Sequence, residues 1–303
     1  MALDNDGSRF LLYARSRGVE FTSTAMIGRQ RLCIDYNRLS GNLADFGYRG
    51  VDIGRLLEGA NGYAEPFLKV LGCEDVCSFD ASPYEQATYV HDFNFPVNPH
   101  FHGRFTSVID GGTLEHIFNF PVAIKNCMEM VTVGGHYLGI TPANNACGHG
   151  FYQFSPELYF RIFSGENGFR THQVIAYDAN RKAPNPWFLA VDPLQLPEPV
   201  SWANQRETYL LVIAERIERK PIFLKPAQQS CYTERVWGKD TDALHTPDVG
   251  AWRGSRLRRS LRQHLPEPMK IPIRWVRRIC LESIYKFNTP YDSRLFRKLG
   301  PPQ

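Results

Sequence analysis

The sequence lacks any long apolar run, although 43% of its 303 residues are apolar. A helix that crosses a membrane needs roughly 18 consecutive apolar residues, and no stretch reaches that length. Residues 1–10 also lack a basic region followed by an apolar one, so they do not resemble a secretory signal. We therefore expect a cytoplasmic protein, which can still associate peripherally with the inner face of a membrane.

Paired cysteines are also lacking. The seven cysteines are an odd number without regular spacing, and they lie at positions 33, 73, 77, 127, 147, 231 and 280. Disulfide frameworks and zinc sites need a paired pattern, so we expect reduced thiols in a reducing compartment. His100 and His102 have the spacing of two ligands on a strand, but Pro96 and Pro99 favour a loop there. The sequence therefore predicts no metal site.

Positive charge is unevenly distributed. Residues 253–303 contain thirteen Lys or Arg and three Asp or Glu, although the whole chain has a net charge of only +4. The basic residues of segment 253–298 alternate with apolar and aromatic ones. Such a segment can pack on the main domain as a solvated helix pair, bind an anionic membrane surface or lipid-linked glycan, or contact nucleic-acid phosphates.

Apolar runs alternate with helical patterns along most of the chain. Strands are expected at residues 21–27, 76–79, 88–90, 105–109, 136–141, 172–177 and 208–216, and helices at 8–18, 64–71, 121–131 and 156–163. This order predicts a doubly wound α/β domain with a mostly parallel seven-stranded sheet and a C-terminal antiparallel hairpin. The domain covers residues 1–220, with an irregular insertion at 181–207, and residues 221–303 form a basic helical extension. Residues 31–55 cannot be placed.

Acidic residues or glycines follow several of the expected strands. Gly28 follows the first strand, Asp80 the second, Asp92 the third, and Asp110, Gly111 and Gly112 the fourth. Ligands of open α/β sheets bind beyond the carboxyl ends of the strands. There, Asp80 can accept hydrogen bonds from both hydroxyls of a ribose, and Asp92 from the amino group of an adenine. Either aspartate can instead be an ordinary turn or capping residue.

Four segments carry a resemblance to a known family. Residues 79–85 (FDASPYE), 90–94 (VHDFN), 105–116 (FTSVIDGGTLEH) and 133–138 (VGGHYL) resemble, in this order, motifs of class I S-adenosylmethionine-dependent methyltransferases. The resemblance implies a Rossmann-like fold and S-adenosylmethionine as cofactor. It adds three residues to the expected cofactor site: Ser82, Phe93 and Glu115. Through residues 144–157 (NNACGHGFYQFSPE) the chain is also similar to bacterial members associated with surface-glycan biosynthesis.

One family motif is missing. These enzymes usually carry Gly-x-Gly-x-Gly after the first strand, where this chain has Ile27-Gly-Arg-Gln30. Side chains at the missing glycine positions would crowd the methionine part of the cofactor. A noncatalytic binding or scaffold protein that retains the fold is therefore an alternative, and its cofactor cleft would be blocked around Arg29 and Gln30. An NAD-linked dehydrogenase is a weaker alternative, because the Gly-x-Gly-x-x-Gly fingerprint is also absent.

Two histidines are candidate general bases. His116 follows the fourth strand and His149 lies between two glycines in the loop after the fifth, and histidine titrates near neutral pH. His116 can equally be a hydrogen-bonded residue at a helix start. Asn144, Asn145 and Tyr152 are candidate ligands for acceptor hydroxyls, although asparagines after a strand often form turns and the aromatic run 151–154 can be core.

The fourth-strand sequence also indicates the kind of acceptor. Enzymes that methylate amino groups of bases or amides often carry Asn/Asp-Pro-Pro-aromatic after this strand, and Asp110-Gly-Gly-Thr113 differs from it. The sequence therefore favours O-methylation of a small-molecule or glycan hydroxyl. A nucleic-acid methyltransferase that uses the basic segment is a further alternative.

Overall fold

The computed structural model describes residues 2–179, 185–196, 204–230, 232 and 296–299. Most of the predicted basic extension lies outside these residues. No helix in the described ranges combines the length and the apolar character that a bilayer crossing requires.

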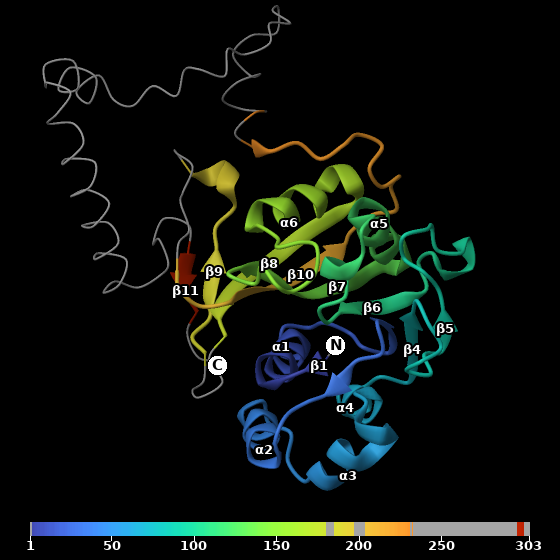
Figure 1. The fold of residues 1–303 in the computed structure, drawn as a ribbon, viewed down its shortest axis with the longest axis vertical. Helices are drawn as coiled ribbons and strands as arrows, with labels where there is room; N and C mark the ends of the chain where they lie inside the picture. The colour runs from blue at the N-terminus through green and yellow to red at the C-terminus, as the bar shows by residue number, and fades with distance from the viewer. Residues whose placement is uncertain (1, 180–184, 197–203, 231, 233–295, 300–303) are drawn as a thin grey trace, which may run out of the picture.

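A nine-stranded mixed sheet forms the centre of the molecule (Figure 1). Its spatial order is β11-β9-β8-β10-β7-β6-β2-β4-β5. The strands along the chain are β2 (Ser23–Ile27), β4 (Asp75–Asp80), β5 (Tyr89–Val90), β6 (Phe105–Asp110), β7 (Val131–Asn144), β8 (Phe169–Asp178), β9 (Phe188–Ala190), β10 (Thr208–Arg216) and β11 (Phe296–Lys298). The five strands from β7 to β5 in the sheet are parallel, and β10 is antiparallel to both β7 and β8.

The sheet corrects the prediction in two respects. The α/β class and the antiparallel closing strand are as expected, but the sheet in the described part of the chain is mixed and has nine strands, where a mostly parallel sheet of seven was predicted. The insertion at 181–207, predicted to be irregular, contains β9, which pairs with β8. Beyond it, β11 comes from the end of the chain and pairs with β9 through Phe296↔Ala190. These two three-residue strands extend the edge at β8, and they are too short to give a recognisable alternating pattern in the sequence.

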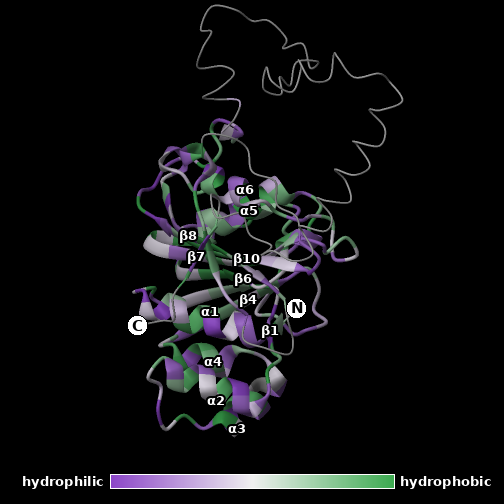
Figure 2. Cartoon of the chain, turned by 90° about the vertical axis from the view of Figure 1, so that its left-hand side faces the viewer, coloured by the Kyte–Doolittle hydropathy of each residue, from purple (hydrophilic) through white to green (hydrophobic). Residues whose placement is uncertain are grey.

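Helices cover both faces of the sheet (Figure 2). One face carries α5 (Phe120–Met130) and α6 (Pro156–Ile162). The other carries α1 (Asn5–Ser16), and beyond it lie α2 (Tyr36–Asp45), α3 (Ile53–Glu58) and α4 (Glu65–Val70). Two apolar clusters fill these two sides, and β-strand alternation assigns successive residues such as Tyr137 and Leu138 to opposite clusters.

Aspartates begin the helices of the region that the sequence left unplaced. Oδ1 of Asp35 accepts a hydrogen bond from the Arg38 amide at 2.9 Å and starts α2, and Asp52 starts α3 in the same way. At the start of α1, Oδ1 of Asp4 accepts from the Gly7 amide at 2.9 Å. Each side chain satisfies a helix N–H that has no intrahelical partner. A small parallel pair, β1 (Ala2–Leu3) with β3 (Arg31–Leu32), joins the two segments.

Asn126 of α5 holds the loop that follows β5. Its Oδ1 accepts from the Val97 amide at 2.9 Å and its Nδ2 donates to the Phe95 carbonyl at 2.8 Å, while only 2% of the residue is exposed. We expect Asn126→Leu to lower the free energy of unfolding by about 2–4 kcal/mol, because it removes two hydrogen bonds and leaves the buried Val97 amide without its partner. Urea unfolding measures the change. Asn119→Leu, which removes a bond to Asn94 at the exposed end of the same helix, should cost less than about 1 kcal/mol; equal losses would contradict this account.

Candidate active site

The order of the strands defines where a ligand can bind. The chain passes from β2 outward to β4 and β5, and then returns to the other side of β2 to form β6 and β7. The carboxyl ends of β2 and β6 therefore border the position at which strand order reverses, and Ile27 and Asp110 are register partners there. Open α/β sheets bind ligands at this position.

The Gln30 side chain lies at this switch point. Gly28 has a φ of 73° and donates its N–H to the Phe79 carbonyl at 2.7 Å, so the chain turns directly after β2. The fully buried Gln30 folds back, and its Nε2 donates to the Ile27 carbonyl at 2.9 Å. A Cβ on Gly111 would lie 2.7 Å from Oε1 of Gln30, so the missing side chain at 111 makes room for it. Within the described residues Oε1 of Gln30 has no hydrogen-bond partner.

Arg29 connects the β2 turn to the loop after β4. Its guanidinium group forms an ion pair with Glu65 at 2.7 Å, donates to the carbonyl of Glu85 at 2.9 Å and stacks on the ring of Tyr63. Arg29 and Gln30, the two positions at which a noncatalytic relative was expected to be blocked, are thus both held by contacts with neighbouring segments.

Asp80 and Ser82 lie beside this connection. Asp80 is the last residue of β4, it is half-buried, and its Oδ1 accepts from the Ser82 amide at 3.1 Å. Asp92, by contrast, is exposed, and its Oδ1 accepts from the backbone and side-chain nitrogens of Asn94. The neighbouring Phe93 is buried against Phe79. Bonds within a turn thus explain the position of Asp92, and core packing explains that of Phe93. The bond from Ser82 explains the position of Asp80 only in part.

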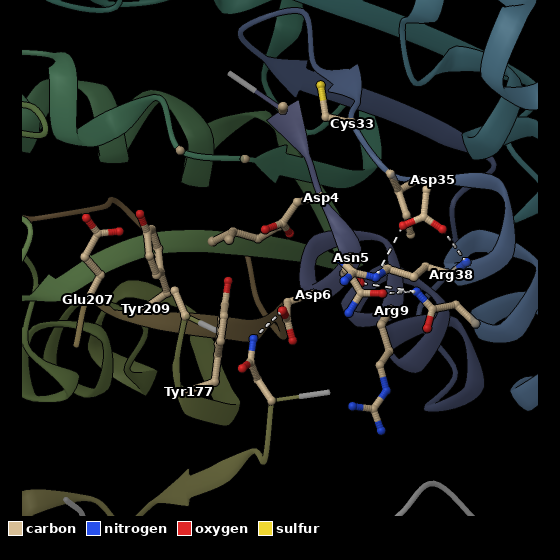
Figure 3. Close-up of a pocket in the computed structure, with 18 of the residues that line it drawn as sticks. Asp4, Asn5, Asp6, Arg9, Cys33, Asp35, Arg38, Tyr177, Glu207 and Tyr209 are labelled. Atoms are coloured by element: carbon tan, nitrogen blue, oxygen red, sulfur yellow. Dashed lines mark hydrogen bonds and ion pairs between the residues drawn. The ribbon is translucent and has the colours of Figure 1, made fainter. Parts of the chain in front are cut away.

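A cavity of about 900 Å³ opens beside the switch point, over the carboxyl ends of β6, β7 and β8 and the first turns of α1 and α2 (Figure 3). Of the predicted residues, Gly111, Gly112, Glu115 and His149 line it, whereas Gly28, Asp80 and Asp92 do not. Its described wall has six carboxylates and two guanidinium groups, from Asp4, Asp6, Asp35, Asp45, Glu115, Glu207, Arg9 and Arg38. The volume is typical of small-molecule sites.

Asp110 is held rigidly at the end of β6. It is fully buried, and its Oδ1 accepts from the Thr113 amide at 2.8 Å while Oδ2 accepts from the hydroxyl of Tyr137 at 3.1 Å. Burial raises the pKa of Asp110 to about 6, although these hydrogen bonds favour the charged form. Asp110 therefore shapes the turn that carries Glu115 and contributes negative charge beneath it.

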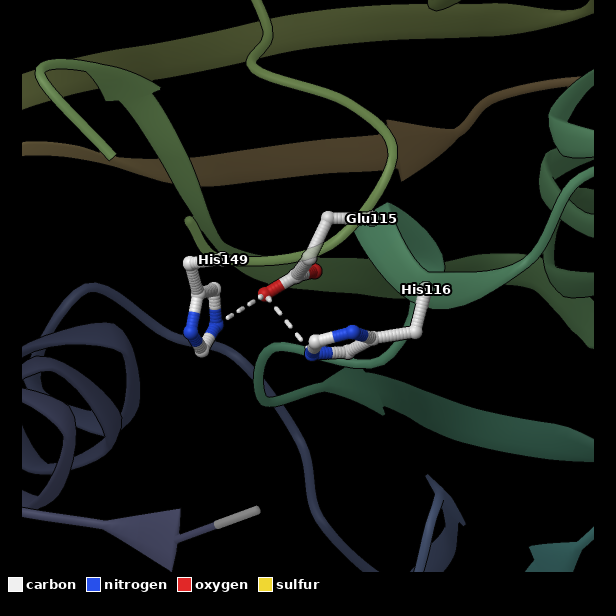
Figure 4. Close-up of side chains that lie close together, drawn as sticks. All are labelled: Glu115, His116 and His149. Atoms are coloured by element: carbon white, nitrogen blue, oxygen red, sulfur yellow. Dashed lines mark ion pairs between the residues drawn. The ribbon is translucent and has the colours of Figure 1, made fainter. Parts of the chain in front are cut away.

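Glu115, His116 and His149 meet at the cavity wall (Figure 4). Nε2 of His149 lies 3.3 Å and Nε2 of His116 lies 4.0 Å from Oε1 of Glu115, and the two imidazole rings are 4.8 Å apart. Glu115 is fully buried, yet neither of its carboxylate oxygens has a hydrogen bond among the described residues. The two histidines are exposed, so the group presents a buried acid and two accessible imidazoles.

The buried acid has a pKa near physiological pH. Burial, followed by the negative charge of Asp110, raises the pKa of Glu115 to about 8. Burial and the neighbouring His149 lower the pKa of His116. Displaced pKa values in a cavity are typical of groups that transfer protons.

The raised pKa of Glu115 predicts that the stability of the fold depends on pH. A carboxyl group whose folded-state pKa exceeds its unfolded value stabilises the fold fully at low pH, and this contribution is lost as the pH rises from about 4.5 through about 8. We expect the free energy of unfolding to fall across this range by ~1.4 kcal/mol per unit of raised pKa. Urea unfolding at pH 5.5, 7 and 8.5 should show a weaker fall in Glu115→Gln than in the wild type. In Glu166→Gln, which alters an exposed acid, the fall should be unchanged; the same slope in all three proteins would contradict the assignment.

Backbone contacts bring His149 to Glu115. The amides of Phe151 and Tyr152 donate to the Glu115 carbonyl at 2.7 and 3.2 Å. Gly150, with a φ of 76°, packs so closely that a Cβ there would lie 2.7 Å from the same oxygen. The loop after β7 is therefore fitted onto the turn after β6, and this fit sets the distance between the imidazole and the carboxylate.

The predicted acceptor ligands have structural contacts. Nδ2 of Asn144 and Nδ2 of Asn145 both donate to Oδ1 of Asn204, so they fasten the start of β10. The hydroxyl of Tyr152 donates to the Phe118 carbonyl at 2.6 Å, and its ring packs on Phe154. None of the three predicted residues lines the cavity.

Two groups of side chains in the described part of the chain have atoms near enough to share a metal ion. One is Glu115, His116 and His149; the other is His136, His172 and Glu215, on adjacent strands at the opposite end of the sheet. In the second group His172 lies 2.8 Å from Glu215, which also pairs with Arg170 at 2.7 Å. His100 and His102 lie in and next to a short turn, where His102 instead contacts Glu129.

The N-terminal helices and the β8–β10 hairpin supply a part of the cavity that was not predicted from the sequence. Asp6 is buried there, and Nδ2 of Asn185 donates to its Oδ2 at 2.7 Å. Tyr177 and Tyr209 are direct register partners across the hairpin. The aspartates before α1 and α2 were visible as helix-start signals, but nothing local shows that the two helix starts face one cavity.

Comparisons with known proteins give only a distant likeness. No family model matches the sequence, and no curated protein matches it. One similar solved structure is the MccD protein, with 10% identity over 70% of this chain and 97% of that one and a TM-score of 0.42. Another is the branched-chain polyamine synthase of Thermus thermophilus in complex with N4-aminopropylspermidine and 5'-methylthioadenosine, with 14% identity over 74% of this chain and a TM-score of 0.36. This chain spans 60% of the synthase.

A third is the N-methyltransferase NodS of Bradyrhizobium japonicum in complex with S-adenosyl-L-homocysteine. It has 14% identity over 69% of this chain and 86% of that one, with a TM-score of 0.36. TM-scores this low support no argument about function. The proposed function depends instead on the strand order and on the geometry of the site.

Proposed function

We propose that this chain is an S-adenosylmethionine-dependent methyltransferase whose acceptor binds in the 900 Å³ cavity. The observation that carries the proposal is the position of Glu115 and His149, on the cavity wall directly beyond the strand-order switch. A group that accepts a proton is thereby placed beside the position at which an α/β sheet binds its cofactor.

The residues at the switch point fit the donor in part. Asp80 lies at the end of β4, where a carboxylate can accept from a ribose, and the backbone of Gly111 and Gly112 lines the cavity at the end of β6. Oε1 of Gln30 is a buried acceptor without a donor, which suits the ammonium group of a methionine moiety. Because Arg29 and Gln30 narrow the turn after β2, the cofactor needs these side chains to shift, as binding-site side chains commonly do.

At the acceptor end, His149 and Glu115 act together on the proton that leaves the acceptor. S-adenosylmethionine supplies an electrophilic methyl group when bound, and the protein positions the acceptor in line and removes its proton. His149 is accessible and accepts a proton from a hydroxyl or ammonium group, while the carboxyl group of Glu115 beside it stabilises the imidazolium that results. His116 flanks the same carboxylate from the other side. We propose a hydroxyl as acceptor, since the fourth-strand motif of amino-methylating enzymes is absent.

Binding of the demethylated product tests the proposal. Isothermal titration of the folded full-length chain with S-adenosylhomocysteine should give one site per chain. Asp80→Asn should weaken it by about tenfold, since a neutral amide accepts from one ribose hydroxyl less well than a carboxylate accepts from two. Asp92→Asn, with its exposed side chain, is the matched control and should bind as the wild type does. No heat with the folded wild type would remove the proposal in favour of a noncatalytic protein.

Two finer predictions from the sequence complete the proposal. The acceptor belongs to surface-glycan biosynthesis, and the basic segment 253–298 brings the 1–220 domain to an anionic membrane surface. Sedimentation with vesicles of anionic and of neutral lipids tests the second prediction, and only the anionic vesicles should retain the chain.

A further inference from the structure

The cavity has an aromatic end, formed by Tyr177, Tyr209 and Glu207. The two tyrosine rings stack with centroids 5.8 Å apart and an angle of 23° between their planes. Both line the cavity, as does Glu207, which immediately precedes β10. Figure 3 shows the three side chains next to one another, opposite Asp4 and Asp6.

Negative charge is concentrated on this end. The described wall of the cavity has six carboxylates against two guanidinium groups. Burial raises the pKa of Tyr209, and the charges of Glu207, Glu115 and Asp4 raise it further. Besides burial, carboxylates from three separate segments thus contribute negative potential at this phenol, and negative potential favours a cation.

Both guanidinium groups of the wall already have partners, and the partner of Arg38 is itself a wall carboxylate, Asp35. Arg9 lies over the ring of Trp187 with 4.8 Å between its Cζ and the ring centroid, and Arg38 pairs with Asp35 at 3.3 Å. At the other end of the cavity, neither oxygen of the fully buried Glu115 has a hydrogen bond among the described residues. A buried carboxyl group without hydrogen bonds is unusual, so it marks a place where a ligand group can supply the partner that the protein does not.

Aromatic rings combined with carboxylates are the surroundings that bind ammonium groups. A cation over the face of a tyrosine ring is attracted by the ring electrons, and this attraction grows when water is excluded. A neutral hydroxyl compound of the same shape gains neither this attraction nor that of the carboxylates.

We propose that the methyl acceptor is an organic cation, with its ammonium group at the aromatic end and its methyl-accepting atom at Glu115. The inference rests on the proposed function for the identity of this cavity as the acceptor site. It names the class of acceptor: a small molecule that carries both a hydroxyl nucleophile and a separate positive charge.

Choline and 3,3-dimethylbutan-1-ol form a matched pair of probes, because they share a hydroxyl and a shape and differ in the ammonium charge. Saturation-transfer NMR with the full chain should show choline bound at least about tenfold more tightly. Glu207→Gln should reduce this preference severalfold. Glu166→Gln, which removes an exposed carboxylate outside the cavity wall, should leave it unchanged.

Equal binding of the two probes, or binding of neither, overturns the inference. A preference for choline that Glu207→Gln leaves intact also overturns it, because a different group would then bind the ammonium charge. Titration of the same preparation with S-adenosylhomocysteine separates the two proposals: if it binds while choline does not, the cation site is wrong and the methyltransferase assignment stands. If choline is preferred but S-adenosylhomocysteine does not bind, the cation site stands without the assignment.

Discussion

Replacement of Glu115 by glutamine should reduce methyl transfer by about 100-fold or more, the usual loss on removal of a general acid–base group. Glutamine keeps the shape of the side chain but neither accepts a proton nor stabilises an imidazolium on His149, which lies 3.3 Å away. The measurement is formation of S-adenosylhomocysteine from S-adenosylmethionine in the presence of a deproteinised small-molecule extract.

The same variant is expected to remain folded. Glu115 is buried without hydrogen bonds, so a neutral amide avoids the cost of a buried charge at alkaline pH. Binding of S-adenosylhomocysteine should therefore persist in Glu115→Gln while turnover falls. His116→Gln, which alters the more distant imidazole at 4.0 Å, should have a smaller effect on turnover. Full activity in Glu115→Gln would show that the acid is a structural residue only.

Replacement of Gly150 by alanine should reduce activity to a similar degree for a different reason. The added Cβ would lie 2.7 Å from the carbonyl oxygen of Glu115, at a φ of 76° that side chains disfavour. The loop must then move off the turn after β6, which separates His149 from the carboxylate. We expect at least a 100-fold loss of turnover, since small displacements of catalytic groups carry losses of that order, and about 1–3 kcal/mol lower stability.

Gly148→Ala is the matched control, because it lies two residues away in the same loop and a Cβ there meets nothing within 4 Å. It should retain activity and stability close to the wild type. Thermal unfolding and the same product assay compare the two variants. If Gly148→Ala and Gly150→Ala behave alike, the close fit of this loop onto Glu115 is not what positions His149.

The acidic strand ends could be located from the sequence because apolar runs followed by acids and glycines have a local pattern. Asp80 and Asp110 lie at the ends of β4 and β6 as predicted. Glu115, His116 and His149 could each be named as candidates because they follow strands, but the sequence did not predict that the three lie together. It also did not show which acids share a cavity, and Asp92 is exposed in a turn that it forms with Asn94.

The remainder of the site depends on contacts between distant segments. Tyr177 faces Tyr209 because of the register of an antiparallel pair, and a shift of one strand by one residue would move its tyrosine to the other face of the sheet. The aspartates at the starts of α1 and α2 line one cavity only because those helices pack on one another. Gln30 fills the switch point because Gly111 has no side chain, and neither residue alone predicts this.

The most direct test of the account is a crystal structure of the full chain with S-adenosylhomocysteine. The account predicts the ribose at Asp80, Gln30 displaced toward or bonded to the methionine moiety, and the sulfur atom facing the cavity at Gly111 and Gly112, with Glu115 and His149 beyond it. A complex in which Gln30 still fills the switch point and the nucleoside lies away from this edge of the sheet would contradict it.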